Sequence, residues 1–591
     1  MNENKDKNAI NIFYACDDNF IKYAIVSVKS LIENASKNYN YIIHFLHTNI
    51  SSKMQESLLK LQTINFKIVF NNVEKELTSC EKLFPIRDYY TKTTYFRMFI
   101  SNMFPEIDKA IYIDSDTIVL GDISELFNTD ISDNYVGACH EQAMVQVNEY
   151  GTYCEEVCGV DRNFYFNAGL LLLNCKAFRK SNLLTKFREL LSVYNFRVTQ
   201  DEDYLNVLCK DRVFWLNDGW NTEVFGEIKV PKEQIKIIHY IMVSKPWHYE
   251  DCRLKEYFWQ YAEKTEYYNE IVKELKEYQI EKKENDLKSL DALLKLAVEE
   301  TVREDSYYKI VKKNRSKDRE EVLKKIKEME KNGVFDVDAE NDPPTIPLKP
   351  NTVDYLRKKP LSKLKSKISF HVANRFVARL RKKKKMIFKG VVGLENWKNL
   401  NSGAIITCNH FNAFDSFAIQ LAYYALKSKK RKFYMVIREG NYTSFPGLYG
   451  FFMRNCNTLP LSSNFSVMKE FLKSVDVLLK DGHYILVYPE QAMWWNYRKP
   501  RPTKSGAFKF SAKNNVPVLP CFITMRDSEV CGEDGFYVQE YTVHVCPPIY
   551  PKKEYSEKEN IEYLKKQNDK AWKDVYENTY MVSLSEVKKC I

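Results

Sequence analysis

Two carboxylates one residue apart, Asp114 and Asp116, directly follow the apolar run Ala110–Ile113. The run indicates a buried strand, and ligands of open α/β sheets bind beyond the carboxyl ends of strands. Two carboxylates at such an end can share a hard divalent cation. That cation can bridge the phosphates of a nucleoside diphosphate and act as a Lewis acid on this leaving group. An isolated Asp-x-Asp is a weak signal, because many such pairs lie in solvated loops.

A second pair, His410 and Asp415, follows another apolar run, Ala404–Cys408. A helical pattern begins at Ser416, which places both side chains in one strand-to-helix turn. A neutral imidazole can take a proton from an attacking hydroxyl if a carboxylate fixes its tautomer and stabilises the resulting cation. The pair therefore indicates general-base catalysis, although this spacing alone often arises by chance.

Several polar segments accompany the acidic pair in the N-terminal half, in a fixed order along the chain. They are Asp17-Asp18-Asn19, Arg97, Phe166-Asn167-Ala168-Gly169, Gln200-Asp201-Glu202-Asp203, and the stretch from His239 to His248. With this order and spacing, residues 10–260 resemble glycosyltransferase family 8, which contains bacterial lipopolysaccharide galactosyltransferases and glycogenin.

This resemblance implies a GT-A-type sheet that binds a UDP-sugar, a hexosyl transfer with retention of configuration, and Mn²⁺ (or Mg²⁺) as cofactor. The metal ligands would be Asp114, Asp116 and His239. The residues implied to bind the donor are Asp17 and Asn19 at the uracil and ribose, Phe20 stacking beside them, and Arg97, Asn167 and Asp201 at the sugar.

Three further positions of the donor site follow from the same resemblance. Lys245 would offset charge on the departing UDP as a compact cation. Glu202, beside the reacting carbon, stands where relatives commonly have Gln. Met242 stands where they commonly have Gly, which puts the close backbone approach to the diphosphate in question.

The histidine–aspartate pair also has informative neighbours. Tyr488-Pro489-Glu490 ends a strand about eighty residues later, and Val516-Pro-Val-Leu-Pro520 begins another. Together these motifs resemble the glycerolipid acyltransferases, typified by the lysophosphatidic acid acyltransferases, over residues 387–550. The resemblance implies that His410 is the general base, Asp415 its orienting partner and Glu490 an acceptor-binding residue. A hydroxyl of a lipid acceptor would attack the thioester of acyl-CoA or an acyl carrier protein, without a cofactor.

The C-terminal half departs from this family where acceptor phosphates are usually bound. Gln491-Ala-Met493 replaces the usual Gly-Thr-Arg, and Leu461 occupies the slot of another arginine. A basic loop offers a substitute, or is simply a solvated turn; its cations are Arg498, Lys499, Arg501 and Lys504. The adjacent aromatic residues belong either to the core or to a lipid interface; they are Trp494, Trp495 and Tyr497.

The elements that must position these residues alternate between strand and helix patterns in both halves, which predicts an α/β fold with mostly parallel sheets. Strands are expected at Ile10–Ala15, Tyr41–His47, Phe66–Phe70, Lys109–Asp114, Tyr165–Asn174, Ala404–Cys408, Phe433–Ile437, His483–Tyr488 and Val516–Thr524, and helices at Ile21–Asn34 and Met54–Leu61. The expected domains are a GT-A-type glycosyltransferase at 8–262, a charged helical connector with a Pro-rich linker at 263–350, a basic membrane-surface segment at 351–390 and an α/β acyltransferase domain at 387–580.

The positive charge is concentrated in one segment. The net charge is +11, whereas residues 357–389 hold fourteen Lys and Arg and no acid. Apolar residues fall at near-helical spacing among these cations: Ile368, Phe370, Val372, Phe376, Val377 and Leu380. Such a basic amphipathic helix is typical of proteins that lie on an anionic membrane. A solvated linker helix and a nucleic-acid contact are the alternatives, and the lipid chemistry that follows disfavours nucleic acid.

Composition excludes several classes. Aromatic residues make up 14% of the 591 residues, which is too much apolar material for a disordered chain. No apolar run approaches the ~20 residues of a spanning helix. The N-terminus lacks the pattern of a secretory signal, and the 14 cysteines form no Cys-x-x-Cys pair, so reduced thiols and a cytoplasmic location at the inner face of the cell membrane are expected.

The sequence thus predicts a bifunctional transferase of bacterial glycolipid or surface-glycan synthesis. Two alternatives remain open. In one, the C-terminal half is only a lipid-binding anchor for an active glycosyltransferase. In the other, both sites are degenerate and the chain is a scaffold without enzymatic activity.

Overall fold

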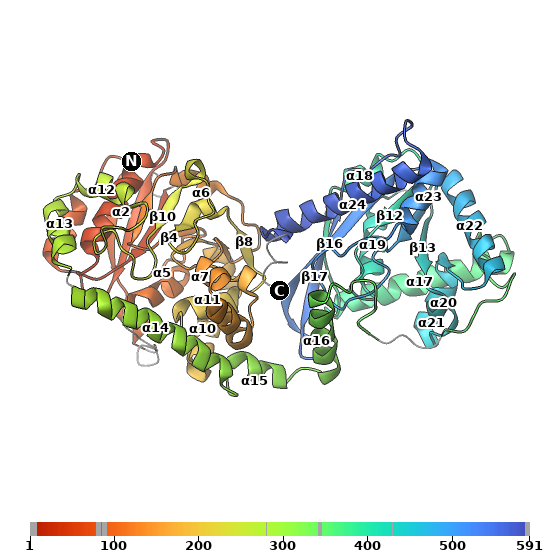
Figure 1. Cartoon of the computed structure of the whole chain (residues 1–591), viewed down its shortest axis with the longest axis horizontal. Helices are drawn as coiled ribbons and strands as arrows, with labels where there is room; N and C mark the ends of the chain where they lie inside the picture. Colours follow the sequence, from red (N-terminus) through yellow and green to blue (C-terminus); the bar gives the residue numbers. More distant parts are fainter. Residues whose placement is uncertain are drawn as a thin grey trace. The chain divides into compact units, whose positions relative to one another are not determined.

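The computed structural model describes residues 9–78, 84, 92–278, 280–340, 345–427 and 430–584. The chain divides into two compact units, Met1–Lys313 and Asn314–Ile591, which are described separately (Figure 1). The first four residues of the Pro-rich stretch, 341–344, lie outside the described residues.

Within the described residues, seven strands form the main sheet of the first unit in the order β3-β2-β1-β4-β7-β6-β8. Their bounds are β1 Ile10–Ala15, β2 Tyr41–His47, β3 Phe66–Asn72, β4 Ala110–Ile113, β6 Val136–Ala138, β7 Leu170–Leu173 and β8 Val213–Trp215. Neighbours pair in parallel except at β7, which runs antiparallel to both β4 and β6. The expected α/β sheet, mostly parallel, is confirmed.

Both faces of this sheet are buried, as expected for a parallel sheet covered by helices. In β4, Ala110 and Tyr112 enter one core cluster, whereas Ile111 and Ile113 enter the other. The helices of the unit are α2 Ile21–Asn34, α3 Ser52–Leu59, α4 Glu74–Leu77, α5 Ile100–Met103, α6 Ile123–Asn128, α7 Gln142–Gln146, α8 Asn148–Tyr153, α9 Cys175–Lys180, α10 Leu183–Val193, α11 Asp201–Cys209 and α12 Lys255–Ala262. Because β4 ends at Ile113, Asp114 begins the loop beyond its carboxyl end.

A second, three-stranded sheet lies beside that loop, with the order β5-β10-β9. Its strands are β5 Thr117–Val119, β9 Thr222–Glu223 and β10 Ile237–His239. The antiparallel register of β5 and β10 pairs His239 with Thr117, and the amide of Tyr240 donates to the carbonyl of Asp116 at 3.0 Å. This register brings His239 next to the acidic pair, although it lies 123 residues after Asp116 in the sequence.

The charged connector is helical, as expected. Its helices are α13 Tyr268–Glu277, α14 Ile280–Val302, α15 Tyr307–Lys313 and α16 Lys317–Lys331. The long helix α14 is part of the first unit (Figure 1) and packs Leu293, Leu296 and Ala297 into its core. Helix α16 belongs to the second unit. The connector is therefore attached to the two units in turn.

In the second unit, seven strands among the described residues form a sheet with the order β11-β17-β16-β12-β15-β13-β14. The strands are β11 Ile387–Val392, β12 Ala404–Thr407, β13 Phe433–Ile437, β14 Thr458–Pro460, β15 Tyr484–Val487, β16 Val518–Cys531 and β17 Tyr537–Val545. All pairs are parallel except β16 with β17. Alternate residues of β12 again face opposite core clusters.

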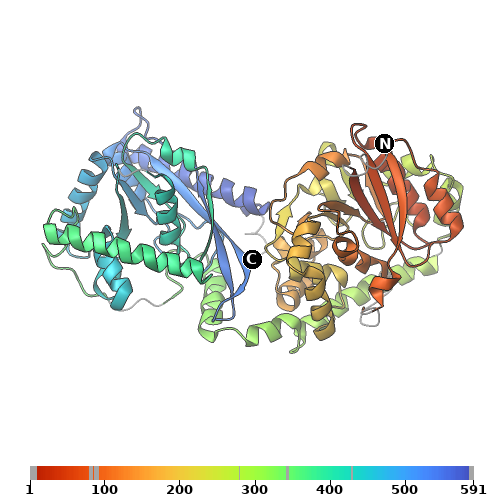
Figure 2. The same cartoon turned by 180° about the vertical axis from the view of Figure 1, so that it is seen from behind.

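Helices cover both faces of this sheet (Figures 1 and 2). They are α17 Pro360–Lys382, α18 Leu394–Lys398, α19 Asp415–Ala425, α20 Glu439–Thr443, α21 Gly447–Asn455, α22 Phe465–Lys480, α23 Gly506–Asn514 and α24 Glu557–Tyr580. The basic segment forms α17, whose Val377 packs into one core cluster, whereas Leu348 and Tyr355 of the linker pack into the opposite one. No helix within the described residues is long and apolar enough to cross a bilayer.

Most predicted strands match the structure closely, and two differ for identifiable reasons. Only Leu170–Leu173 of the predicted Tyr165–Asn174 is a strand, because Asn167 and Gly169 form a hydrogen-bonded turn at 2.9 Å before it. Strand β16 continues beyond Thr524 to Cys531 because β17 pairs with it in a long hairpin. All twelve described cysteines are free thiols.

Candidate functional sites

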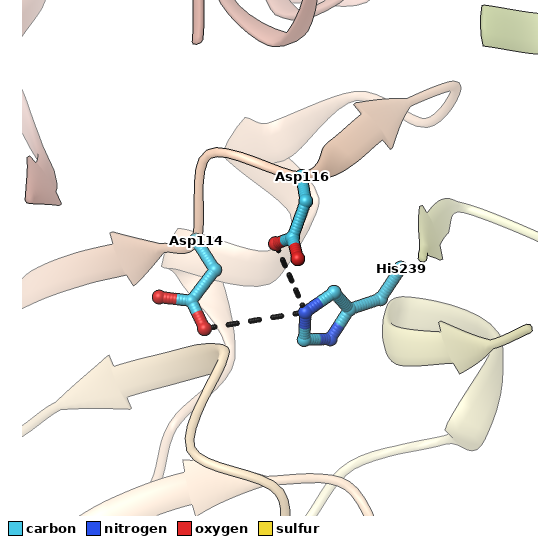
Figure 3. A group of neighbouring side chains, drawn as sticks. All are labelled: Asp114, Asp116 and His239. Carbon is cyan, nitrogen blue, oxygen red and sulfur yellow. Dashed lines mark ion pairs between the residues drawn. The ribbon is translucent and has the colours of Figure 1, made fainter. Parts of the chain in front are cut away.

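The residues predicted to ligate a metal converge in the first unit. Figure 3 shows Asp114 and Asp116 on the loop between β4 and β5, with the ring of His239 directed towards both. His239 Nε2 lies 3.2 Å from Asp116 Oδ1 and 4.0 Å from Asp114 Oδ2. The possible ligand atoms of the three residues lie within 4.8 Å of one another. Two carboxylate oxygens and an imidazole nitrogen at this spacing fit a single divalent cation.

A hydrogen bond with Asn221 orients the ring of His239. Its Nδ1 is 3.1 Å from Asn221 Oδ1, and a hydrogen bond donated by Nδ1 would leave the lone pair of Nε2 for a cation. Asn221 is held in turn by donating to Asn167 Oδ1 at 2.9 Å. Gly169 leaves room for the ring, because a Cβ there would lie 2.2 Å from His239 Cε1 and 2.8 Å from Asp114 Oδ2.

Cations surround the acidic pair. Arg97 contacts Asp114 at 3.2 Å and Asp201 at 3.0 Å, and Lys245 Nζ lies 2.5 Å from Asp116 Oδ2. Burial alone would raise the pKa of Asp116, but the charges of Lys245 and His239 lower it below its usual range. Asp116 is therefore ionised at neutral pH, as a metal ligand must be.

The carboxyl groups of the predicted sugar-binding residues lie in a drier environment. Burial raises the pKa of Asp201 to about 6, although Arg97 opposes the shift. Burial and the neighbouring Glu141 raise the pKa of Glu202 well above its usual value. Glu202 Oε2 accepts from the amide of Ala168 at 2.8 Å. A protonated Glu202 is neutral and can both donate and accept, as the amide of Gln does.

The structure places the predicted nucleotide-binding residues where β1 ends. Asp17 Oδ1 accepts from the amides of Asn19 and Phe20 at 3.0 and 3.3 Å, which closes a turn before α2. Asn19 is exposed, and the ring of Phe20 packs edge-on against Tyr23. Base and ribose contacts by this turn remain predictions.

Met242 follows the metal histidine at a position where the backbone is left-handed, with φ of +54°. Residues with a Cβ rarely adopt this conformation, which costs them about 1–2 kcal/mol, whereas glycine adopts it freely. The backbone at Met242 therefore has the conformation that favours glycine, although the residue is methionine.

In the second unit, the predicted catalytic pair is in contact. His410 Nδ1 lies 2.7 Å from Asp415 Oδ2, and the same oxygen accepts from the amide of Phe411 at 3.1 Å. Asp415 is 1% exposed, whereas a quarter of the His410 side chain is exposed. Nδ1 therefore donates its hydrogen bond to Asp415, and Nε2 can act as a base.

Tyr488 supports this pair from the neighbouring strand. Its hydroxyl donates to Asp415 Oδ1 at 2.7 Å, and its ring stacks on His410 with centroids 4.1 Å apart. Burial and Asp415 raise the pKa of Tyr488, so the hydroxyl remains a donor. Both oxygens of Asp415 are therefore occupied, which fixes the imidazole in place.

Glu490, predicted to bind the acceptor, is 2% exposed in the structure. Its Oε2 accepts from the amide of His410 at 2.9 Å and from Arg501 at 2.7 Å. Arg501 is also buried and donates to the carbonyl of His410 at 3.0 Å. Through these contacts, the buried side chains of Glu490 and Arg501 hold the backbone at His410 in position. Acceptor binding by Glu490 remains a prediction.

The other cations of the predicted basic loop are each paired with an acid. Arg498 contacts Asp527 at 3.1 Å, Lys499 contacts Glu330 at 2.8 Å, and Lys504 contacts Asp336 at 3.0 Å. The suggestion of a simply solvated turn is therefore wrong. The nearby aromatic residues belong to the core rather than to an interface, since Trp494 is fully buried and Trp495 is 9% exposed.

A cavity of about 700 Å³ adjoins His410. Much of its lining is apolar, and includes Phe417, Met435, Phe445, Tyr449, Met453 and Leu461. Charged residues line it as well, including Arg438 and Lys504. A cavity of this size and lining suits an aliphatic chain whose reactive end lies near an imidazole.

Comparisons with known proteins match each half of the chain to a family. The family model for glycosyl transferase family 8 matches residues 11–251, and an acyltransferase model matches residues 390–524. A putative glycosyltransferase of Haemophilus influenzae is 31% identical over 40% of this chain and 73% of its own length. The lipopolysaccharide 1,3-galactosyltransferase of Salmonella typhimurium is 25% identical over 42% of this chain and 75% of its own length. The solved 1-acyl-sn-glycerophosphate acyltransferase PlsC of Thermotoga maritima is 19% identical, with a TM-score of 0.26, over 37% of this chain and 85% of that chain.

The fold and the two sites thus define a two-domain transferase. The chain belongs to glycosyltransferase family 8 through its first unit and carries an acyltransferase domain in its second, so it is an enzyme with both activities.

Several residues that complete the sites were missed by the sequence reasoning. Asn221 and Glu141 stand in no recognised motif, because their partners lie far away in the sequence. Gly169 lies two residues after Asn167, and Tyr488 lies two residues before Glu490. This closeness to predicted site residues was the signal that could have assigned them a role.

We expect Gly169→Ala to weaken metal binding by about 10–100-fold, because the added methyl group displaces His239 and Asp114. Calorimetric titration of Mn²⁺ in the presence of UDP measures this. Gly121→Ala is the matched control, since its methyl group meets only the flexible side chain of Lys236. Equal affinities in the two variants would contradict the close packing of Gly169 on the ligands.

We expect His410→Ala to lower thioester turnover by about 10²–10⁴-fold, the usual contribution of a general base. Release of free thiol from acyl-CoA measures it. His483→Ala is the control, because that ring lies at the opposite end of β15 and contacts the Lys432 amide at 3.2 Å. Measurable turnover that does not change in His410→Ala would exclude this mechanism.

Proposed function

We propose that the first unit transfers a hexose from a UDP-sugar, with Mn²⁺ as the metal and with retention of configuration, and that the second acylates a hydroxyl of a lipid-linked acceptor in glycolipid or surface-glycan synthesis. The convergence of Asp114, Asp116 and His239 from separate strands is the observation that carries the first activity. The relatives that act on lipopolysaccharide support the choice of pathway.

In the donor site, Asp114, Asp116 and His239 would hold the cation, which when bound supplies charge neutralisation and Lewis acidity at a diphosphate. Lys245 adds a second positive charge beside Asp116 for the departing UDP. Glu202, kept protonated by burial and by Glu141, presents a neutral hydrogen-bonding group to the sugar, as the Gln of relatives does.

In the acyl site, His410 Nε2 takes the proton of the acceptor hydroxyl while Asp415 stabilises the imidazolium through Nδ1. The hydroxyl oxygen forms a bond to the thioester carbonyl carbon, the carbon–sulfur bond breaks, and His410 returns the proton to the leaving thiolate. The apolar lining beside it accommodates the acyl chain of acyl-CoA or an acyl carrier protein.

Helix α17 is proposed to place the enzyme on an anionic membrane. Its C-terminal half packs on the unit: Phe376 contacts Phe417 and Tyr449, with ring centroids 6.2 and 5.7 Å apart. Its N-terminal half exposes an apolar stripe at helical spacing, Leu361, Leu364 and Ile368, each about half exposed or more, between exposed lysines. Because Phe417 and Tyr449 also line the acyl cavity, the helix links a surface suited to lipid with the site that consumes it.

The donor activity is tested by UDP release across a panel of UDP-sugars with Mn²⁺ and no acceptor. We expect slow hydrolysis of one donor, and at least ~10²-fold less in Asp114→Asn/Asp116→Asn, because the variant loses both anionic ligands. Asp130→Asn, in an exposed turn, is the control. No UDP release from any donor would favour the degenerate scaffold instead.

The membrane association is tested by sedimentation with phosphatidylglycerol vesicles. Leu364→Ser/Ile368→Ser should reduce the bound fraction several-fold, by removing apolar groups that insert between lipids, and binding should fall as salt screens the lysines. Ile64→Ser removes an exposed isoleucine of the first unit and should have no effect. Failure of the unaltered chain to bind at any salt concentration would remove this part of the proposal.

A further inference from the structure

One wall of the acyl cavity comes from the connector rather than from the acyltransferase region itself. Residues 333–340 follow α16, and three of their acids line the cavity: Asp336, Asp338 and Glu340. The segment is anchored on Trp494. The ring of Phe335 stacks on this indole with centroids 5.5 Å apart, and the indole Nε1 donates to the carbonyl of Val337 at 2.8 Å. The connector is thus part of the built site.

The connector acids neutralise the cations of the cavity. Among its described lining residues, the lysine and arginine side chains are those of Lys504 and Arg438. Lys504 Nζ lies 3.0 Å from Asp336 Oδ2, and Arg438 forms an ion pair with Asp338. Asp338 Oδ1 also accepts from the amide of Met493 at 2.7 Å. Each of these two cations, which could bind a phosphate, is therefore already in an ion pair with a carboxylate.

Among the described residues, the remaining lining offers a phosphate no further lysine or arginine side chain. Leu461 and Met493 line the cavity where the acyltransferases that this sequence resembles usually carry arginine. With Asp415 and Glu340 included, carboxylates outnumber the lysine and arginine side chains of the lining, and Glu340 is paired with Arg319 outside it. A phosphate entering here meets like charges at short range, or must displace a carboxylate from its partner. Hydroxyl groups meet no such penalty, since they donate hydrogen bonds to carboxylates that retain free lone pairs.

We propose that Asp336 and Asp338 determine the specificity of acyl transfer, so that the site accepts an uncharged hydroxyl compound of the polyol or sugar class and rejects one with a phosphate near the reacting hydroxyl. This inference rests on the proposed acyl transfer. The acceptor oxygen forms the ester bond, and the thiol leaves with the proton carried by His410. A hexosyl transfer yields products of this class, so the reaction of the first unit is of the kind that would supply the acceptor.

The test uses the full chain, lauroyl-CoA as donor, and two acceptors that differ only in a phosphate: monooleoylglycerol and oleoyl-lysophosphatidic acid. Octyl glucoside serves as a sugar acceptor. We expect the unaltered enzyme to favour the uncharged acceptors in kcat/KM by at least ~10-fold, since specificity of this kind reflects like-charge rejection. Asp336→Asn/Asp338→Asn should raise kcat/KM for the phosphate acceptor, relative to kcat/KM for the uncharged acceptors, by at least ~10-fold.

Two further variants keep the test decisive. Asp336→Asn alone changes an exposed side chain and should shift the preference in the same direction even if the double variant folds poorly. Asp476→Asn breaks a comparable lysine pair, with Lys513 at 2.7 Å, away from the cavity and should change nothing.

The outcomes separate this inference from the proposed function. Thioester hydrolysis that depends on His410, measured without an acceptor, shows that the catalytic site works. If that hydrolysis is present and the unaltered enzyme prefers lysophosphatidic acid, only the specificity inference is overturned. Equal gains for all acceptors in the double variant would also overturn it, because the connector would then merely obstruct the site. If no acyl-CoA turnover depends on His410, the acyl transfer itself is refuted.

Discussion

Both sites depend on one constraint: a carboxylate held beyond the end of a strand, largely out of water, needs a cation or hydrogen-bond donors to remain ionised. Asp116 has Lys245 and His239, and Asp415 has His410, Tyr488 and a backbone amide. In each site, the group that pairs with the carboxylate is also a residue to which the proposed function assigns a chemical role. The surrounding architecture, parallel strands covered on both faces, serves to keep water away from these pairs.

Departures from the family patterns divide into two physical kinds. Met242 and Gln491 replace common glycines, yet both keep left-handed backbone, with φ of +54° and +62°. Both positions therefore have the backbone conformation that favours glycine, and each carries a side chain there. Leu461 and Met493 replace charged groups, and the two cations that do line the acyl cavity, Arg438 and Lys504, are paired with acids. Replacing a glycine strains the backbone, whereas replacing a charged residue changes which ligands the site can hold.

The connector shows how charge patterns read locally can mislead. Residues 498–504 suggest a basic patch when taken alone, and Asp336 and Glu330 belong to a run that suggests a solvated helix and linker. In the fold these two segments neutralise each other through Lys499–Glu330 and Lys504–Asp336. Complementary charges more than 160 residues apart leave no periodic signal, so only the folded chain shows that both belong to the wall of one site.

Strands and helices with clear periodicity, such as Ile10–Ala15, Tyr41–His47 and Ile21–Asn34, could be predicted from the amino acids alone, because burial of alternating or helical apolar positions is a local property. The carboxylates and histidines at the ends of those strands could be predicted in the same way. The folded chain was needed to see that β5 pairs with β10 and so brings His239 to Asp116, that Asn221 contacts the His239 ring, and that the connector lines the acyl cavity. These contacts join distant residues, and their energy comes from packing and pairing that no short window of sequence contains.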